Sequence, residues 1–118
     1  PPRPGQGALA WGIGALAAWR AESRTEINRR GAAFRSALRE ANAWRVSSVG
    51  AYFAFVRHPF EGVSSLKVAE ALATRRGVLA LPGTYFGPGQ DDHIRIAFAN
   101  VGTDVIAELP ARLEGLEM

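Results

Sequence analysis

Apolar residues recur at helical spacing over the first third of the chain. After Gly7 and as far as Ala41, helix-forming residues dominate, and the helix breakers are Gly12, Gly14 and Gly31. Spacings of three, four and seven align the larger apolar side chains Leu9, Ile13 and Leu16, and then Ile27, Phe34 and Leu38. The pattern predicts one long helix, straight or bent, of about 50 Å. A compact domain of this length is only about 35 Å across, so part of the helix should project.

The two halves of this helix differ in character. The first half is apolar, with Trp11 and Trp19 among alanines, whereas the charged residues gather between Glu22 and Glu40. Because an apolar helix surface needs a partner, we expect the first half to pack against a part of the protein that this chain does not contain.

The pattern changes from helical to strand-like after residue 42. Residues 44–47 alternate as an exposed edge strand does, and the run from Ala51 to Val56 is apolar on both faces, as in a central strand buried on both sides. Ser64 or Ser65 can cap a following helix, and Gly77 provides its C-terminal stop.

A second pair of strands is expected beyond Gly77. Residues 78–81 form a short apolar strand, and glycines and prolines punctuate a loop over residues 82–89. In the next strand Ile94, Ile96 and Phe98 face one way, whereas Arg95, Ala97 and Ala99 face the other. The small alanines leave room for the planar fork of Arg95 to receive a carboxylate in bidentate geometry. The pattern alone favours a surface arginine.

A final helix completes the predicted fold. Thr103 can cap it, Ile106, Leu109 and Leu113 point inward, and Pro110 bends it or removes a hydrogen bond. The order of elements indicates an α+β fold: a long N-terminal helix, then a small, mainly antiparallel sheet of about four strands with helices packed on it. Residues 1–41 form the proline-rich start and the long helix, and residues 42–118 form the small α+β domain.

Composition places the chain among ordinary soluble domains. It has 118 residues, 47% of them hydrophobic and 21% charged, and no apolar run is long enough to span a bilayer. It lacks an initiator methionine and opens on prolines without the layout of a secretory signal, so we expect it to be a piece cut from a cytoplasmic protein. The net charge of +3 comes almost entirely from arginine, since Lys67 is the only lysine. Such a mild excess is not a nucleic-acid signature.

The sequence contains no recognisable catalytic set. There are no cysteines, and His58 and His93 are the only histidines, which argues against a metal site. No nucleophile elbow or phosphate-binding glycine-lysine loop occurs. His58 is expected to stabilise a turn, Lys67 to be solvated, and Asp91 and Asp92 to form a turn.

The arginines of the long helix are also expected to be solvated. Acidic residues are interspersed among them, and Glu26 and Arg30 are spaced for a helical ion pair. An arginine-rich module that binds nucleic acid or an acidic partner through this helix stays open as an alternative function.

Two stretches of the small domain resemble a known family. The segments Gly77-Val78-Leu79-Ala80-Leu81-Pro82-Gly83-Thr84-Tyr85-Phe86-Gly87 and His93-Ile94-Arg95-Ile96-Ala97-Phe98-Ala99-Asn100 resemble the C-terminal part of class I and II pyridoxal-phosphate-dependent aminotransferases. The resemblance extends back through residues 50–56 to the long helix. It implies that Arg95 binds the substrate α-carboxylate and that Thr84, Tyr85 and Phe86 lie on the active-site loop.

The resemblance also implies what the chain lacks. The family's Schiff-base lysine, pyridine-binding aspartate and phosphate-binding groups lie on a large domain that this sequence does not contain, and Lys67 has no motif like that of the cofactor lysine. The chain therefore looks like the small domain plus interdomain helix of a fold-type-I subunit, which closes over the active site. No residue of this chain is expected to be catalytic, to bind the cofactor or to bind metal, and the isolated chain should carry no pyridoxal phosphate and be inactive.

The implied whole enzyme is a cytoplasmic homodimer that acts on amino acids and 2-oxo acids. It uses pyridoxal phosphate and binds neither nucleic acid nor a membrane. Related lyases, decarboxylases and synthases share this small domain, so the reaction type within the fold remains open, as does the substrate side chain.

Overall fold

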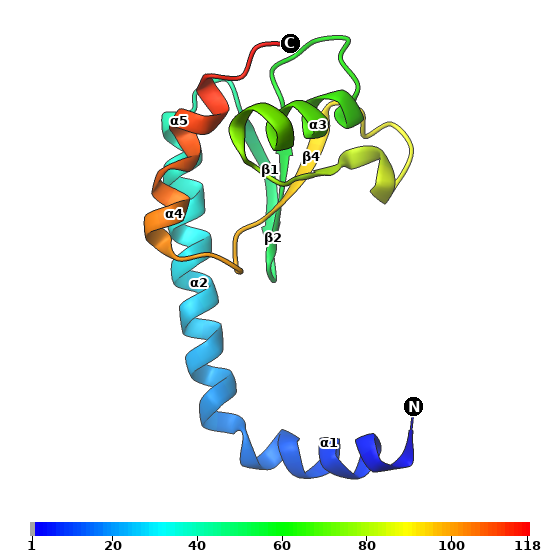
Figure 1. Cartoon of the computed structure of the whole chain (residues 1–118). Coiled ribbons are helices and arrows are strands. Elements are labelled where there is room, and N and C mark those ends of the chain that lie inside the picture. The colour runs from blue at the N-terminus through cyan, green and yellow to red at the C-terminus, as the bar shows by residue number, and fades with distance from the viewer. Residues whose placement is uncertain (1) are drawn as a thin grey trace.

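The computed structural model describes residues 2–118 and has the expected α+β architecture (Figure 1). Its elements, in chain order, are α1 (Arg3–Ala15), α2 (Ala17–Glu40), β1 (Arg45–Gly50), β2 (Phe53–Arg57), α3 (Ser65–Arg76), β3 (Leu81–Pro82), the 3-10 helix η1 (Gly83–Phe86), β4 (His93–Ala97), α4 (Thr103–Ala107) and α5 (Leu109–Glu114). The long helix, the small antiparallel sheet and the packed helices are all confirmed.

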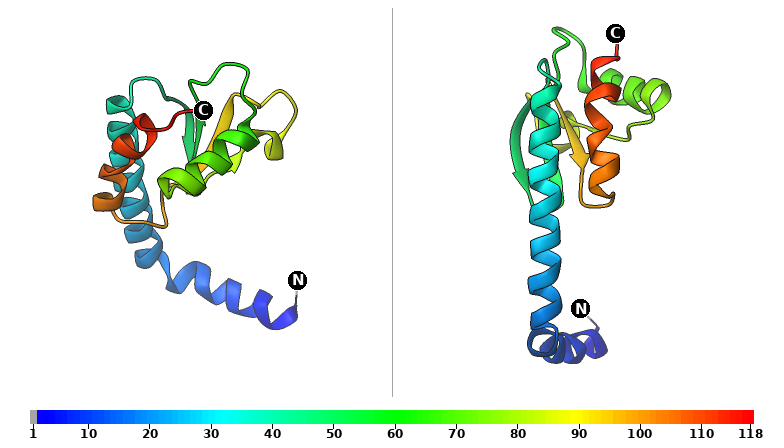
Figure 2. Two further views of the ribbon diagram at one scale, coloured as in Figure 1. Left: turned by 45° about the horizontal axis from the view of Figure 1, so that its top comes forward. Right: turned by 90° about the vertical axis from the view of Figure 1, so that its left-hand side faces the viewer.

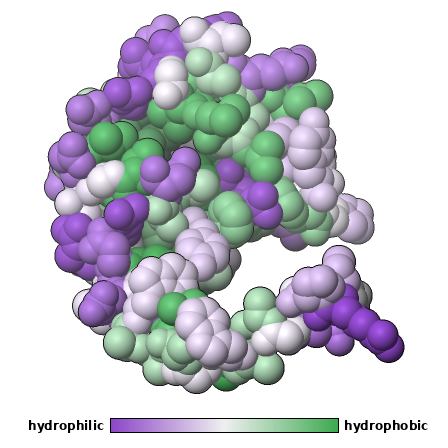
Figure 3. Space-filling model, turned by 60° about the horizontal axis from the view of Figure 1, so that its bottom comes forward, coloured by the Kyte–Doolittle hydropathy of each residue, from purple (hydrophilic) through white to green (hydrophobic). Residues whose placement is uncertain are grey.

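The N-terminal helix is bent, and the bend lies at Leu16. There the backbone leaves the helical range, with φ −99° and ψ 21°, and the chain continues as α2. Figure 1 shows α2 running beside the sheet and α1 turning away beneath it. No residue of α1 is buried, and Figure 3 shows hydrophobic and near-neutral residues around it, with hydrophilic ones gathered at its N-terminal end. The molecule measures 51 × 30 × 23 Å, so the expected projection is confirmed.

The sheet has the strand order β1-β2-β4-β3, and every neighbouring pair is antiparallel. One face carries Ala54, Val56, Ile94 and Ile96, all almost fully buried. Two views in Figure 2 show the helices gathered on this side, where Phe34 and Leu38 of α2 and Val68 and Leu72 of α3 join the core.

The opposite face of the sheet is open, which corrects one expectation. The strand β2 is central, but it is buried on one face only: Phe53 is 38% exposed and Phe55 is half-buried. Within residues 2–118, the helix residues of the core pack on the other face. Phe86 of the 3-10 helix η1 covers part of the open face beside Phe55, and apolar surface of β2 remains accessible there.

The prediction of a strand over residues 78–81 is mostly wrong. Only Leu81 and Pro82 pair with β4, while Val78 and Ala80 are buried and Leu79 is 82% exposed. The N–H of Val78 donates to the carbonyl of Leu72, because the chain leaves α3 through the left-handed Gly77. These residues therefore close the helix before they reach the sheet. The stop at Gly77 and the cap at Ser64 are confirmed.

The final helix is divided in two, as expected from Pro110, and its N-cap is not the predicted residue. The helix α4 ends at Ala107, and α5 begins at Leu109 with the proline in its first turn. Gly102, not Thr103, is the N-cap, because the Thr103 hydroxyl instead accepts a hydrogen bond from Arg29 at 3.2 Å. The inward positions of Ile106, Leu109 and Leu113 are confirmed by their burial.

Candidate functional site

Arg95 lies at the centre of the open sheet face. Its strand neighbours Ile94 and Ile96 point into the core, so the alternation of β4 turns the guanidinium to the other side. Across the sheet it is paired with Phe55 on β2 and with Leu81 on β3. Ala97 shares its face, but Ala99 packs against the core, because β4 ends at Ala97. The expectation that Ala99 lines the same face is therefore wrong.

Two aromatic rings enclose the guanidinium of Arg95. The Cζ atom lies 4.2 Å from the ring centroid of Phe53 and 4.0 Å from that of Phe86. Both distances are within the range of cation–π attraction. The phenylalanines restrict the arginine while leaving its N–H groups to hydrogen-bond outward. We call Arg95, Phe53 and Phe86 the arginine clamp.

Phe86 reaches the clamp through a tightly constrained turn. Gly83 is buried, and a Cβ there would collide with the backbone carbonyl oxygens of Gln90 and His93, so only glycine fits. Thr84 turns away from Arg95, and its hydroxyl lies 3.3 Å from that of the fully buried Ser65 on α3. Tyr85 is 67% exposed. Of the three predicted loop residues, the structure brings only Phe86 onto Arg95.

The positive charge of Arg95 has no acidic partner among residues 2–118. The ion pairs of this part of the chain involve other arginines, and Arg95 is half-buried. A guanidinium held between two rings, with no carboxylate beside it, can bind an anion through its N–H groups. A planar carboxylate fits this fork in bidentate geometry.

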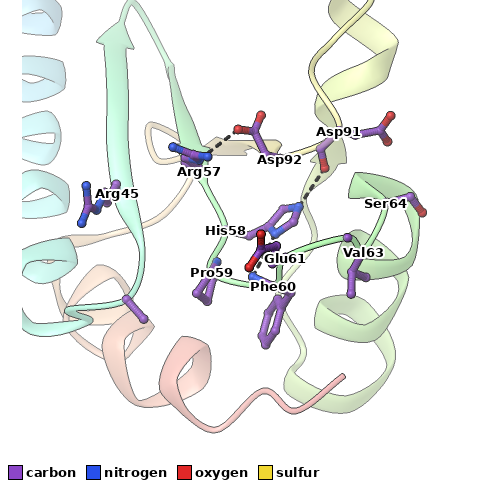
Figure 4. A pocket seen from close by; sticks show the side chains of 12 residues that line it. Arg45, Arg57, His58, Pro59, Phe60, Glu61, Val63, Ser64, Asp91 and Asp92 are labelled. Atoms are coloured by element: carbon purple, nitrogen blue, oxygen red, sulfur yellow. Dashed lines mark hydrogen bonds and ion pairs between the residues drawn. The ribbon is translucent and has the colours of Figure 1, made fainter.

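The other candidate residues occupy structural positions. His58 is buried, and its Nε2 lies 2.8 Å from the carbonyl oxygen of Asp91. Its Nδ1 accepts a hydrogen bond from the N–H of Phe60 at 3.3 Å. Figure 4 shows these contacts beside a hollow that the two loops line. It holds two loops together, which confirms its predicted turn-stabilising role. Lys67 is exposed on α3, as expected. The part of the chain that the structure describes contains no group of three or more metal-ligating side chains.

The predicted ion pair on the long helix is also confirmed. Arg30 binds Glu26 at 2.7 Å, and Arg29 binds the same carboxylate at 2.8 Å. Hydrogen bonds from these arginines, the first of them from Arg29, hold the pKa of Glu26 at about 2. Arg30 also donates to the carbonyl of Ala99 at 2.6 Å, so this cluster joins α2 to the chain after β4.

Two features escaped the sequence analysis. The ring of Phe53 was assigned to a strand buried on both faces, whereas it covers Arg95. Ser47, His93 and Asp92 form a hydrogen-bonded chain, although no catalytic spacing in the sequence indicated one. The adjacency of Asp92 and His93 was visible, but Ser47 is 46 positions from His93, and only the paired strands bring them together.

The sequence profile described as aminotransferase class I and II matches residues 2–113. The chain belongs to this family. No curated protein sequence matches it. None of the helices described in residues 2–118 is long and apolar enough to cross a membrane.

Solved aminotransferases have the same fold as this family member. An aromatic aminotransferase from Pyrococcus horikoshii OT3 is 29% identical, with a TM-score of 0.67 over 81% of this chain and 26% of that one. N-succinyldiaminopimelate aminotransferase from Mycobacterium tuberculosis is 27% identical, with a TM-score of 0.75 over 92% of this chain and 29% of that one. The chain thus spans about a quarter of the length of these aminotransferases.

A more distant aminotransferase supports the fold alone. The α-aminoadipate aminotransferase LysN of Thermus thermophilus, complexed with N-(5'-phosphopyridoxyl)-L-leucine, is 21% identical. Its TM-score is 0.74 over 89% of this chain and 28% of that one.

Proposed function

We propose that this chain is the small domain of a pyridoxal-phosphate-dependent aminotransferase subunit, in which Arg95 binds the α-carboxylate of an amino acid or 2-oxo acid. The observation that carries the proposal is a half-buried guanidinium clamped between Phe53 and Phe86 with no acidic partner among the described residues. A carboxylate bound there holds the substrate in a fixed orientation. Membership of the aminotransferase family supports transamination as the reaction of the complete subunit.

The loop of residues 83–86 forms one wall of the proposed substrate site. Thr84 fastens the loop to α3, Phe86 covers one face of Arg95, and the exposed Tyr85 is free to border the substrate. In this proposal the small domain closes over the active site and contributes binding and orientation, whereas the reacting groups come from the rest of a cytoplasmic homodimer.

Pyridoxal phosphate, when bound, supplies the electron sink for this chemistry. Its usual anchor is a lysine, and the only lysine here does not fit. Lys67 is exposed on α3, whose buried residues Val68 and Leu72 pack on the core face of the sheet, while Arg95 lies on the opposite face. We therefore propose that the cofactor is held outside this chain and that the isolated chain is inactive.

The proposed role of Arg95 predicts a specific kinetic defect. In the complete subunit, Arg95→Lys keeps the charge but loses the two-pronged hydrogen bonding, which is worth about 1.5 to 3 kcal/mol. We expect kcat/KM for amino acids to fall about ten- to a hundredfold. Steady-state kinetics measures the fall, and the visible absorption of the bound cofactor should be unchanged.

Two outcomes would contradict the assignment. Amino-acid turnover that is intact in Arg95→Lys would return Arg95 to the solvated surface. Loss of the cofactor from the variant would instead place Arg95 in the cofactor site. Arg45→Lys, on the same sheet but outside the clamp, is the matched control.

A further inference from the structure

Ser47, His93 and Asp92 form a continuous hydrogen-bonded chain on the open sheet face, beside the arginine clamp. The Oγ of Ser47 lies 2.9 Å from Nε2 of His93, and Nδ1 of His93 lies 2.5 Å from Oδ1 of Asp92. A hydroxyl, an imidazole and a carboxylate in this order are the arrangement that activates a serine nucleophile.

The fold explains why Ser47 reaches His93. The pairing of β1 with β2 shifts between Val46 and Ser48, so Ser47 is the extra residue of a bulge. Bulges redirect side chains, and this one turns the Ser47 hydroxyl over the open sheet face toward β4. The imidazole of His93 is itself held flat by Phe55, with ring centroids 5.0 Å apart and planes 15° from parallel.

The hydrogen bonds define where the protons lie. A carboxylate only accepts, so Nδ1 of the neutral ring carries the proton, and the lone pair of Nε2 faces the Ser47 hydroxyl. The other oxygen of Asp92 binds Nε of Arg57 at 2.9 Å, as the dashed line in Figure 4 shows. Desolvation raises the pKa of Asp92, but the hydrogen bond from His93 and the charge of Arg57 act against it, and the pKa is lowered overall.

Among residues 2–118, one unpaired arginine beside this chain, Arg45, favours an anionic reactant. Arg45 precedes Ser47 by two residues on β1 and lies opposite Arg57 in the sheet. Arg45 is exposed and has no ion-pair partner within residues 2–118. Arg45 and Arg57 line one side of an open hollow of about 840 Å³, whose lining also includes the acidic residues Glu61, Asp91 and Asp92 (Figure 4). Arg57 is paired with Asp92, so Arg45, whose charge is unpaired within the described residues, is the group that would attract a leaving group with negative charge.

We propose that Ser47 is an activated serine that accepts the acyl group of small acyl phosphates. The Ser47 Oγ attacks the carbonyl carbon, and its proton passes to Nε2 of His93. The carbonyl carbon–oxygen bond to the phosphate breaks, and the electron pair leaves on the phosphate oxygen. His93 passes the proton from Nε2 to the departing phosphate oxygen, so the products are O-acyl-Ser47 and hydrogen phosphate. Asp92 orients the imidazole throughout.

This site uses different reacting groups from the proposed carboxylate site, although His93 and Arg95 lie two residues apart on the same face of β4 and Phe55 contacts both His93 and Phe86. Arg95 takes no part in the hydrogen-bonded chain, and neither Phe53 nor Phe86 contacts Ser47 or Asp92 by any recorded ring or polar contact. A failure of the carboxylate assignment would leave the serine chemistry untouched, and the reverse is also true.

Acetyl phosphate is the probe, and Ser48 is the internal control. The purified chain is incubated with acetyl phosphate, and the acetylation rate of each serine is followed by peptide mass spectrometry. We expect Ser47 to react at least about tenfold faster than its neighbour Ser48, because a positioned base typically contributes about a hundredfold or more. Equal rates at the two serines would overturn the proposal.

Variants separate activation from simple exposure. His93→Phe keeps an aromatic ring against Phe55 but removes the base, so the acetylation rate of Ser47 should fall to that of Ser48. Ser48→Ala should leave Ser47 unchanged. Circular dichroism and the melting temperature check that each variant is folded. A rate at Ser47 that is unaffected in folded His93→Phe would overturn the role of the base.

A second probe tests the recognition of the leaving group. Arg45→Gln should slow the reaction of Ser47 with acetyl phosphate but not with p-nitrophenyl acetate, whose ester is uncharged. Equal effects on both reagents, or none on either, would overturn the assignment of acyl phosphates as the reactant class.

Discussion

A single arginine carries most of the proposed function, and its setting explains why. An exposed arginine samples many rotamers, whereas two rings hold the guanidinium of Arg95 in one place. Preorganisation of this kind reduces the entropy lost when a ligand binds. If Arg95 binds the substrate carboxylate as proposed, Phe53 and Phe86 contribute to that binding by holding the guanidinium in place, without touching the carboxylate themselves.

Removal of one ring should weaken the carboxylate site. Cation–π contacts are worth about 0.5 to 2 kcal/mol, so Phe53→Leu should raise KM for the amino-acid substrate of the complete subunit about two- to thirtyfold. Phe53→Tyr keeps the aromatic face and should restore the affinity.

The neighbouring Tyr52 provides the matched control for this test. It is 53% exposed and packs edge-on against Phe53, with no recorded contact to Arg95. If Tyr52→Leu raised KM as much as Phe53→Leu, the effect would come from local packing, and the clamp would have no role of its own.

Between elements, one carboxylate organises the contact of α2 with the C-terminal part of the chain. Glu26 holds Arg29 and Arg30, which in turn donate to the Thr103 hydroxyl and the Ala99 carbonyl. The cluster thus connects a helix at the start of the chain to the segment that follows β4.

This cluster predicts a loss of stability in acid. The pKa of Glu26 is lowered from 4.5 to about 2, first of all by its hydrogen bond from Arg29. A lowered pKa means that the folded state favours the ionised carboxylate, so the stabilisation is complete above pH 4.5 and lost as the pH falls toward 2. Melting temperatures measured across this range should fall more steeply for the native chain than for Glu26→Gln.

The control for acid stability lies one turn away. Glu22 is on the same helix and is exposed, without an ion-pair partner in the described part of the chain. Glu22→Gln should leave the pH dependence unchanged. The interpretation fails if Glu22→Gln and Glu26→Gln flatten the curve equally.

At the scale of the whole molecule, α1 is the feature that the fold leaves uncovered. Leu9, Trp11 and Ile13 are each more than half exposed, and so is Trp19 at the start of α2. Apolar surface of this extent normally contacts a partner. In the complete subunit, we propose that the large domain covers it.

The isolated chain should therefore self-associate or lose the order of its N-terminal half. Ile13→Gln should reduce association, because it places a polar side chain in the middle of the apolar surface. Leu79→Gln, which changes an isolated leucine that is 82% exposed, is the control and should not. Sedimentation velocity measures the association. A sharply monomeric chain in which α1 is helical and exposed in hydrogen exchange would contradict this prediction.

Local pattern was sufficient for most of the fold. Helical spacing placed Phe34 and Leu38 on one apolar stripe, which the core buries, and strand alternation put Ile94 and Ile96 on the face opposite Arg95. The predicted helix end at Gly77 and the predicted interruption of the last helix at Pro110 are both confirmed. These features depend on residues a few positions apart, so a single sequence contains them.

The tertiary structure decided what depends on distant neighbours. Residues 78–80 are apolar enough to form a strand, but no neighbouring strand pairs with them. The sequence of β2 alone also does not show that one of its faces stays uncovered. The arginine clamp joins three separate segments, and Ser47 meets His93 only through the bulge in β1. The sequence by itself determined which faces are apolar and where elements end, because those properties are local. Which side chains meet across the sheet depends on register and loop path, and these are set only when the whole chain packs.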